Sequence, residues 1–173
     1  MSKKEEYKLK NEQFLQTLRT EEGVKELGAG VLYRVLESGQ GNNATPRLNS
    51  IVSVHYKGML INGREFDNSW KRNCPEAFRL NEVIDGWQIA LQQMHVGDHW
   101  MVYIPYAVGY GTRTSGPIPA FSTLVFEVKL LGIAKEDSSG DVTKRRPYTR
   151  RHNGYTVAFH LAYDGGFAAA TML

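Results

Sequence analysis

An Asn-Gly pair between two stretches of strand periodicity constrains this chain more than any other feature. Residues 51–60 read IVSVHYKGML and place Val52, Val54 and Tyr56 on one face, which is the alternation of a half-buried strand. The following Asn-Gly tolerates the positive φ of a two-residue turn, and the chain returns through REFDNS. The pattern predicts a β-hairpin that carries Tyr56 and Phe66 on neighbouring strands.

The same alternation predicts three further strands, at residues 31–38, 99–105 and 122–133. Before the second of these, EVIDGWQIALQQM repeats its apolar side chains every three or four positions, which predicts a helix over residues 83–94. Residues 105–122 hold three glycines and three prolines. A loop of that length in a compact domain is usually functional.

Several strands and one short helix, joined mostly by hairpins, predict an antiparallel sheet with the helix against one face, an α+β fold. Residues 3–20 are expected to form a short, weakly amphipathic helix. The predicted division is an N-terminal helical extension at 1–22, the main domain at 23–134, and a linker with a basic and apolar tail at 135–173.

Composition excludes several classes of function. With 21 basic and 18 acidic side chains and a net charge of +3, the whole molecule is not expected to bind nucleic acid or an anionic membrane. The single cysteine, Cys74, excludes an internal disulfide and a cysteine-rich metal site. No apolar run is long enough for a signal peptide or a membrane span, so the chain as written is expected in the cytoplasm; a trimmed leader would instead indicate the periplasm or cell envelope.

Motifs of hydrolases, zinc proteases and phosphate-binding loops are missing from the sequence. His95 and His99 are four residues apart but separated by Gly97, and a turn with two exposed imidazoles outweighs a metal site there. We therefore expect no metal and no cofactor. The candidate active groups are aromatic, and each of them is also explained by a place in the core: Tyr56, Phe66, Trp87, Tyr110 and Phe126.

Four stretches resemble one known family: VSVHYKGMLINGREFDNSW, EVIDGWQIALQQMHVGD, YGTRTSGPIP and STLVFEVKLLGI are similar to the FKBP-type peptidyl-prolyl cis-trans isomerases. The preceding EEGVKELGAGVLYRVLESGQG is similar to the bacterial branch related to the macrophage infectivity potentiator proteins. The resemblance covers residues 20–134. It implies an antiparallel sheet of about five strands wrapped around one short helix.

The resemblance also implies a hydrophobic pocket for a prolyl residue. Trp87 would form its floor, the Ile84 N–H and the Tyr110 hydroxyl would bind substrate carbonyls, and the Asp67 carboxylate would edge the site. Ile118 would contribute from the overhanging loop. Phe78 is open between pocket and core, with the core favoured. The full set implied by the resemblance is Tyr56, Phe66, Asp67, Val83, Ile84, Trp87, Tyr110, Ile118 and Phe126.

Such a pocket would rotate an Xaa-Pro bond without proton transfer or a nucleophile. The barrier is about 20 kcal/mol, and a dry aromatic site disfavours the planar, charge-separated amide relative to the twisted one. Asp67 is then expected to orient Tyr56 or another donor rather than to act as acid or base. Losing the aromatic ring at position 66 or 87 should reduce activity more than Asp67→Asn.

Three functional classes stay open from the sequence. The first is a prolyl isomerase for proline-containing peptides and unfolded proteins, inhibited by macrolides of the FK506 or rapamycin type. The second is a catalytically weak proline-peptide-binding module or chaperone, which the altered loop at Pro119-Ala120-Phe121 keeps open although the presence of Tyr56, Asp67, Trp87 and Tyr110 weighs against it. The third is nucleic-acid binding by the basic segment 143–152, although a solvated charge run is commoner.

The tail and the N-terminus carry two last expectations. Asn153-Gly154 lies between a basic arm and the alternating YTVAFHLAY, which predicts a second hairpin docked on the isomerase body or on a second copy, against the alternative of a disordered tail. Homo-oligomerisation stays open, because the related bacterial proteins dimerise through a helical domain longer than residues 1–20.

Overall fold

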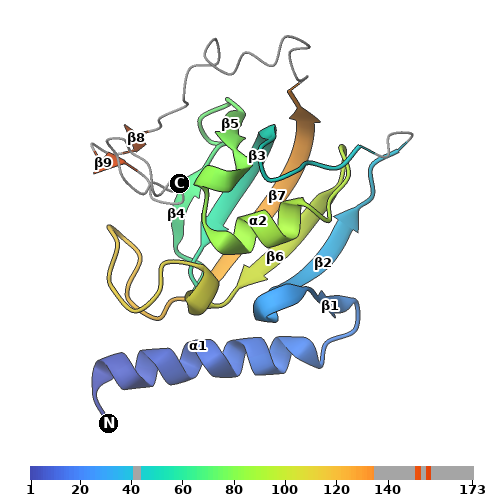
Figure 1. Cartoon of the computed structure of the whole chain (residues 1–173). Helices are drawn as coiled ribbons and strands as arrows, with labels where there is room; N and C mark the ends of the chain where they lie inside the picture. Colours follow the sequence, from blue (N-terminus) through green and yellow to red (C-terminus); the bar gives the residue numbers. More distant parts are fainter. Residues whose placement is uncertain (41–43, 135–150, 153–154, 157–173) are drawn as a thin grey trace.

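The structure, a computed structural model, describes residues 1–40, 44–134, 151–152 and 155–156 (Figure 1). The helices and strands in chain order are α1 (Lys3–Arg19), β1 (Val24–Glu26), β2 (Leu32–Glu37), β3 (Ile51–Met59), β4 (Glu65–Asn68), β5 (Glu76–Arg79), α2 (Asp85–Leu91), β6 (His99–Ile104), β7 (Leu124–Ile133), β8 (Arg151–His152) and β9 (Tyr155–Thr156).

One seven-stranded sheet organises the fold. Its order is β1-β2-β6-β7-β3-β4, and β5 also pairs with β3. Every pair between these strands is antiparallel. The predicted α+β class with an antiparallel sheet, one short helix and an N-terminal helix is confirmed. The strands beyond the expected five are β1 and β5, which are too short to show a clear alternation.

The outer edge of β3 is shared by two short strands. β4 pairs with Lys57–Met59 at one end, and β5 pairs with Ile51–Val54 at the other. Between β4 and β5 the chain makes an excursion over residues 69–75. This interruption lies opposite Tyr56, so side chains of the excursion are brought next to the phenol.

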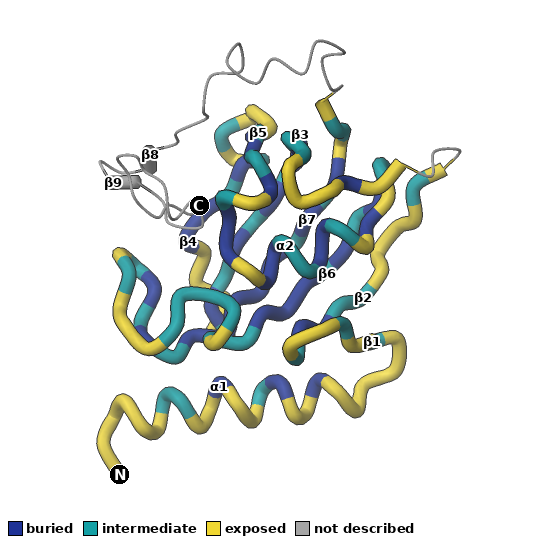
Figure 2. The backbone as a smooth tube through the Cα atoms, viewed as in Figure 1, coloured by how far each residue is buried: buried dark blue, intermediate teal, exposed yellow. Residues whose placement is uncertain are grey.

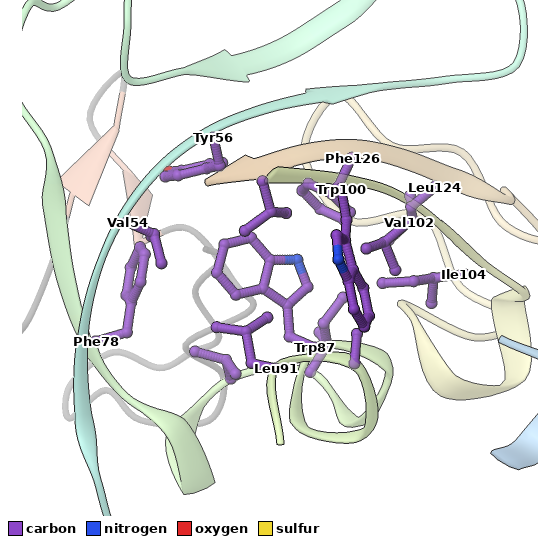
Figure 3. Packing of buried hydrophobic residues seen from close by; sticks show 14 of the residues in the cluster. Val54, Tyr56, Phe78, Trp87, Leu91, Trp100, Val102, Ile104, Leu124 and Phe126 are labelled. Atoms are coloured by element: carbon purple, nitrogen blue, oxygen red, sulfur yellow. The ribbon is translucent and has the colours of Figure 1, made fainter. Parts of the chain in front are cut away.

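The inner face of the sheet packs against α2. β3 buries every second residue, as its alternation predicts, and the tube view shows the buried positions gathered where the sheet faces α2 (Figure 2). The Trp87 indole lies in the middle of this core, surrounded by side chains from β3, β5, β6 and β7 (Figure 3). The core therefore lies between the short helix α2 and a curved sheet.

The first helix packs against the opposite face of the sheet. A capping box at Ser2 and Glu5 starts α1. Leu15 and Leu18 are buried against Leu32, Tyr103 and Val125, side chains that point away from the inner core. The sheet is thus covered by α2 on one face and, near one end, by α1 on the other.

Two segments differ in detail from the sequence predictions. The helix expected over 83–94 is α-helical only over α2, because Val83 and Ile84 have extended backbone and residues 92–94 form a looser turn. The loop 105–122 contains a 3-10 turn at Tyr106–Val108 and an antiparallel bridge from Ser115 to Ile118.

In the tail, β8 pairs with β9 through Arg151↔Thr156 and His152↔Tyr155, on either side of the Asn-Gly pair. The rest of the predicted second hairpin and its docking lie outside the described residues, so the hairpin and the division of the chain at 22 and 134 stay predictions. Among the described residues, no helix combines the length and apolar character needed to span a membrane.

Candidate functional site

An aromatic box surrounds Trp87, a fully buried residue of α2. The indole meets Tyr56 of β3 and Phe126 of β7 at right angles, with ring centroids 5.3 Å away in both cases, and Phe78 of β5 at 5.7 Å (Figure 3). Edge-to-face contacts of this kind stabilise a fixed ring geometry. Phe78 is fully buried in this box, so the core placement favoured from the sequence agrees with the structure.

Phe66 extends the box along β4. Its ring stands perpendicular to Phe126 at 5.6 Å. The two rings meet above Gly58 of β3, where a β-carbon would lie 2.6 Å from Phe66 and 2.7 Å from Phe126. Glycine at this position leaves room for both rings next to the strand.

The start of α2 supplies a short segment of backbone beside the box. Val83 and Ile84 are buried and extended, and the Ile84 carbonyl accepts the N–H of Trp87 at 3.0 Å and of Gln88 at 3.2 Å. The N–H groups that begin a helix have no acceptor within it, so this turn offers main-chain donors next to the indole. Gln88 steadies the turn by donating to the Val83 carbonyl at 2.8 Å.

The long loop brings the remaining two expected residues to the same cluster. Ile118 is 2% exposed and belongs to the inner core, and Tyr110 packs against that core from outside. The structure therefore brings all the apolar residues of the predicted set together, although they come from β3, β4, β7, α2 and the loop.

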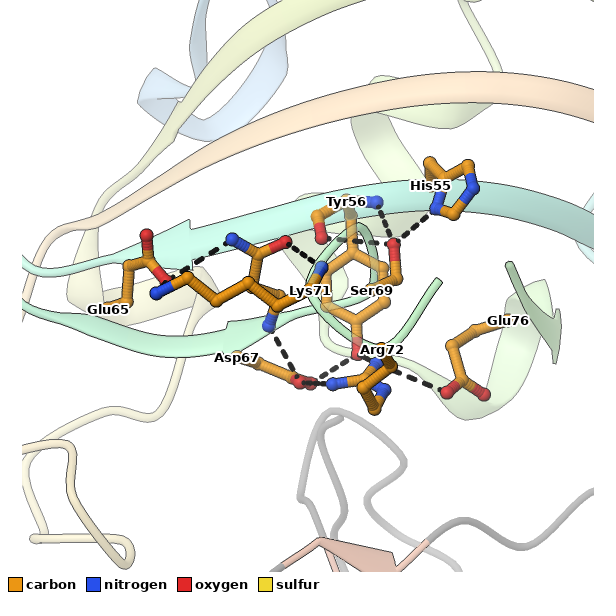
Figure 4. Close-up of polar contacts among 9 residues, drawn as sticks. His55, Tyr56, Glu65, Asp67, Ser69, Lys71, Arg72 and Glu76 are labelled. Carbon is orange, nitrogen blue, oxygen red and sulfur yellow. Dashed lines mark hydrogen bonds and ion pairs between the residues drawn. The ribbon is translucent and has the colours of Figure 1, made fainter. Parts of the chain in front are cut away.

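The polar end of the box is an ionic network around Asp67 (Figure 4). The Tyr56 hydroxyl donates to one carboxylate oxygen of Asp67, and Arg72 donates to the other at 2.5 Å. The second nitrogen of the guanidinium donates to Glu76 at 3.1 Å and lies 3.5 Å from the Tyr56 oxygen. The bond between Tyr56 and Asp67 is the contact that the expected orienting role of Asp67 requires.

The position of that acid differs from the expectation. The resemblance implied a carboxylate at the edge of the site, but the Asp67 side chain is fully buried and Arg72, 28% exposed, lies between it and solvent. A carboxylate can be buried in this way because both of its oxygens are paired or hydrogen-bonded.

Sequence reasoning missed Arg72. The residue sits in the excursion between β4 and β5, next to Lys71, and the two cannot be told apart by pattern. The structure separates them: Arg72 points to Asp67, while Lys71 binds Glu65 at 3.0 Å and lowers the pKa of that carboxyl. The usable signal was the planar guanidinium, which can bridge two carboxylates where an ammonium cannot.

Ser69 and His55 form a second group of polar contacts, at the backbone of Tyr56. The Ser69 hydroxyl accepts the Tyr56 N–H at 2.8 Å and also lies 2.8 Å from Nδ1 of His55. Burial, followed by the charges of Lys129 and Arg72, lowers the pKa of His55. The imidazole stacks on Trp70 with centroids 5.3 Å apart.

From the sequence, we expect both imidazoles of the turn at His95 and His99 to be exposed. In the structure His95 is exposed and His99 is partly buried. His99 begins β6 and one ring nitrogen lies 2.7 Å from Glu127, with 20% of its side chain exposed. Within the part of the chain that the structure describes, no group of three or more potential metal ligands is assembled.

Comparisons with known proteins agree with this geometry. Residues 42–131 match the family model described as FKBP-type peptidyl-prolyl cis-trans isomerase. The FKBP-type isomerase FkpA of Aeromonas hydrophila is 41% identical over 136 residues, covering 79% of this chain and 50% of that protein. The outer membrane protein MIP of Legionella longbeachae is 37% identical over 134 residues, covering 77% and 57%.

Among solved structures, a peptidyl-prolyl cis-trans isomerase from Pseudomonas syringae pv. tomato superposes with a TM-score of 0.71 at 36% identity, covering 78% of this chain and 98% of that one. The chain spans about half the length of the curated relatives it matches. The expected cytoplasmic location finds no support among these relatives. The resemblance seen in the four sequence stretches is confirmed, and the chain belongs to the FKBP-type peptidyl-prolyl cis-trans isomerases.

Proposed function

We propose that the chain catalyses rotation about Xaa-Pro bonds in peptides and folding proteins. The observation that carries the proposal is the right-angled packing of Tyr56 and Phe126 around Trp87, next to the extended backbone at Ile84. A pyrrolidine ring stacked on such a surface leaves water, while main-chain donors and the Tyr110 hydroxyl hold the flanking carbonyls.

The chemistry follows from the amide itself. A planar Xaa-Pro amide is stabilised by resonance that places negative charge on oxygen, and water favours that polar form. Transfer to an apolar site removes this hydration and lowers the free energy needed to twist the bond. Contacts that fit only the twisted amide add to the rate, at about tenfold for each 1.4 kcal/mol.

No group in the network needs to exchange a proton with substrate. Asp67 and Arg72 neutralise one another, and both hold the Tyr56 phenol in place. We therefore assign them to positioning, and the binding surface to Phe66, Val83, Ile84, Trp87, Tyr110, Ile118 and Phe126.

The test is the catalysed cis-to-trans relaxation of a chromogenic tetrapeptide with a central Leu-Pro bond. The full chain should accelerate it, Phe66→Ala and Trp87→Phe should each lower kcat/KM by about tenfold or more, and Asp67→Asn should lower it less. Trp100→Phe is the matched control, because it shortens a second buried indole of the same core without changing an assigned residue.

Two results would contradict the proposal. One is binding of the tetrapeptide by the folded chain without acceleration, which would favour a proline-peptide-binding module. The other is an equal loss of kcat/KM in Trp87→Phe and Trp100→Phe. This would mean that the loss of activity comes from poorer packing of the core in general and not from the prolyl site.

Partners and location are proposed on the same basis. Members of the FKBP family bind proline-containing peptides and macrolides. We extend both ligand classes to this chain, with FK506 or rapamycin as the macrolide. A relative whose name places it in the outer membrane supports the cell envelope as the compartment, and fractionation of cells that make the natural protein tests that location.

A further inference from the structure

The loop between β6 and β7 is closed by main-chain hydrogen bonds between its two halves. The Phe121 N–H donates to the Gly111 carbonyl at 3.0 Å, and Ser115 and Ile118 exchange two main-chain hydrogen bonds at 2.8 and 2.9 Å. These bonds tie the two halves of the loop together. Phe121 is thereby bonded to the residue that follows Tyr110, and Ile118 lies in the bridge between the two halves.

The end of this loop is fastened to α1 by a buried side chain. Asn11 is fully buried, and its Oδ1 accepts the Thr123 N–H at 2.7 Å while its Nδ2 donates to the Tyr7 carbonyl at 2.8 Å. Both polar ends of the amide are satisfied, one by the loop and one by the helix. A buried asparagine placed this way fixes the register between the two segments.

A second fastening lies one helical turn earlier. The Tyr7 hydroxyl is 2.8 Å from the Ser122 hydroxyl, which in turn donates to the Pro119 carbonyl at 2.7 Å. Because the carbonyl can only accept, the proton of Ser122 is used there, and Tyr7 is the donor to Ser122. The chain of bonds runs from the helix to the residue that follows Ile118.

Phe121 completes the contact. Its φ of +65° is uncommon for an aromatic residue. The ring packs edge-on against Tyr106 at 5.0 Å, and the ammonium groups of Lys4 and Lys8 lie 5.5 and 5.3 Å from its centre. The first two turns of α1 thus cover the ring whose backbone closes the loop.

Elsewhere α1 does not press on the loop. A groove of about 470 Å³ separates the helix from the start of the loop at Pro105, Tyr106 and Ala107. The connection between helix and loop is therefore made by the polar contacts of Tyr7 and Asn11 and by the lysines over Phe121, and not by continuous packing.

We propose that Tyr7 and Asn11 are positioning residues for the prolyl site. They hold the loop in the conformation that presents Tyr110 and Ile118 to the aromatic box, so that the N-terminal helix sets how well substrate binds. The inference rests on the proposed isomerase function for its kinetic readout. Its structural readout, the exchange of loop amides, does not depend on that function.

The decisive variant is Tyr7→Phe in the full chain, which removes one hydroxyl and keeps the ring. Tyr33→Phe, the same change on the inner face of β2, is the matched control. We expect faster hydrogen exchange at the Ile118 and Phe121 amides than in the wild type, with the amides of β3 and β7 unchanged. The KM for the Leu-Pro tetrapeptide should rise about fivefold with kcat nearly constant, because fewer molecules hold the binding-competent loop.

Asn11→Ala should increase both the exchange of the loop amides and the KM further than Tyr7→Phe does. If Asn11→Ala does not fold, Tyr7→Phe alone decides the matter. Loop exchange and KM equal to those of Tyr33→Phe would overturn the proposal. So would a uniform increase in exchange over the whole sheet, which would mean that Tyr7 only stabilises the fold. A wild-type chain without turnover would refute the proposed function, and the exchange of the loop amides would still decide whether α1 positions the loop.

Discussion

Gly58 is the residue on which the two outer aromatics of the site depend. β3 needs no positive φ there, so the requirement is purely for space: the Phe66 and Phe126 rings occupy the volume that a side chain would fill. Inserting a methyl group under two packed rings forces them off their rotamers. The same atoms thus serve the stability of the sheet and the shape of the prolyl surface.

We predict that Gly58→Ala lowers the free energy of unfolding by about 1–3 kcal/mol, because of this overpacking, and weakens peptide binding. Urea denaturation followed by tryptophan fluorescence measures the first effect. Gly132→Ala in β7 is the control: nothing lies within 4 Å of the added β-carbon, so its effect should stay within about 0.5 kcal/mol. Equal stability of the two variants would show that the rings yield without cost.

At the same scale, the sequence predicted the apolar side chains of the site but not its ionic network. Phe66, Trp87 and Phe126 stand out as large residues in periodic positions, and the family resemblance identified them. Arg72 lies in an irregular excursion where no period exists, and its contact with Asp67 depends on the break between β4 and β5. The burial of Asp67 follows from that same contact, so it could not be predicted before the arginine was placed.

At the scale of elements, α1 is part of the domain's packing. Leu15 and Leu18 cover Tyr103, Val125 and Leu32, which lie on the outer face of their strands. Without the helix these side chains would be exposed to water, at a cost of about 25 cal/mol for each Å² of apolar surface. Unfolding of the helix and of the sheet should therefore be coupled.

We predict that Leu15→Ala lowers the free energy of global unfolding by about 2–4 kcal/mol, as expected for a leucine that is 6% exposed. The fluorescence of Trp87 and Trp100, which lie on the opposite face of the sheet, should report the loss. Leu9→Ala on the same helix removes a side chain that is 41% exposed and should change stability by less than about 0.5 kcal/mol. If the two variants unfolded alike, α1 would be an appendage.

The elements themselves were predictable where periodicity was long. β3, β6 and β7 and the helix around Trp87 follow clear alternation or helical spacing, whereas β1 and β5 have three and four residues. The docking of α1 left a readable signal: VLY at 31–33 and LVF at 124–126 are continuous apolar runs, which is typical of strands buried on both faces. The hydrogen bonds of Asn11 left none, because a polar residue on a helix does not indicate its partner.

At the scale of the whole molecule, the proposed prolyl surface forms only when the whole domain is folded. Its walls come from β3, β4, β7, the start of α2 and the loop before β7, which are separate in the sequence and meet only in the folded domain. Global unfolding separates all of them at once. A ligand of this surface therefore binds the folded chain and not the unfolded one, so binding must appear as added stability.

We predict that FK506 or rapamycin, at one hundred times its dissociation constant, raises the free energy of unfolding by about 2.7 kcal/mol. For a chain of this size the midpoint of thermal unfolding should then rise by roughly 5–10 °C. Phe66→Ala provides the specific comparison, because it removes one wall of the surface and leaves the Trp87 box: at the same macrolide concentration its shift should be smaller, in proportion to its weaker binding. The control Trp100→Phe should shift as the wild type does. A folded wild-type chain whose midpoint does not move under a saturating macrolide would show that the aromatic box is packed as core and is closed to ligands of this class.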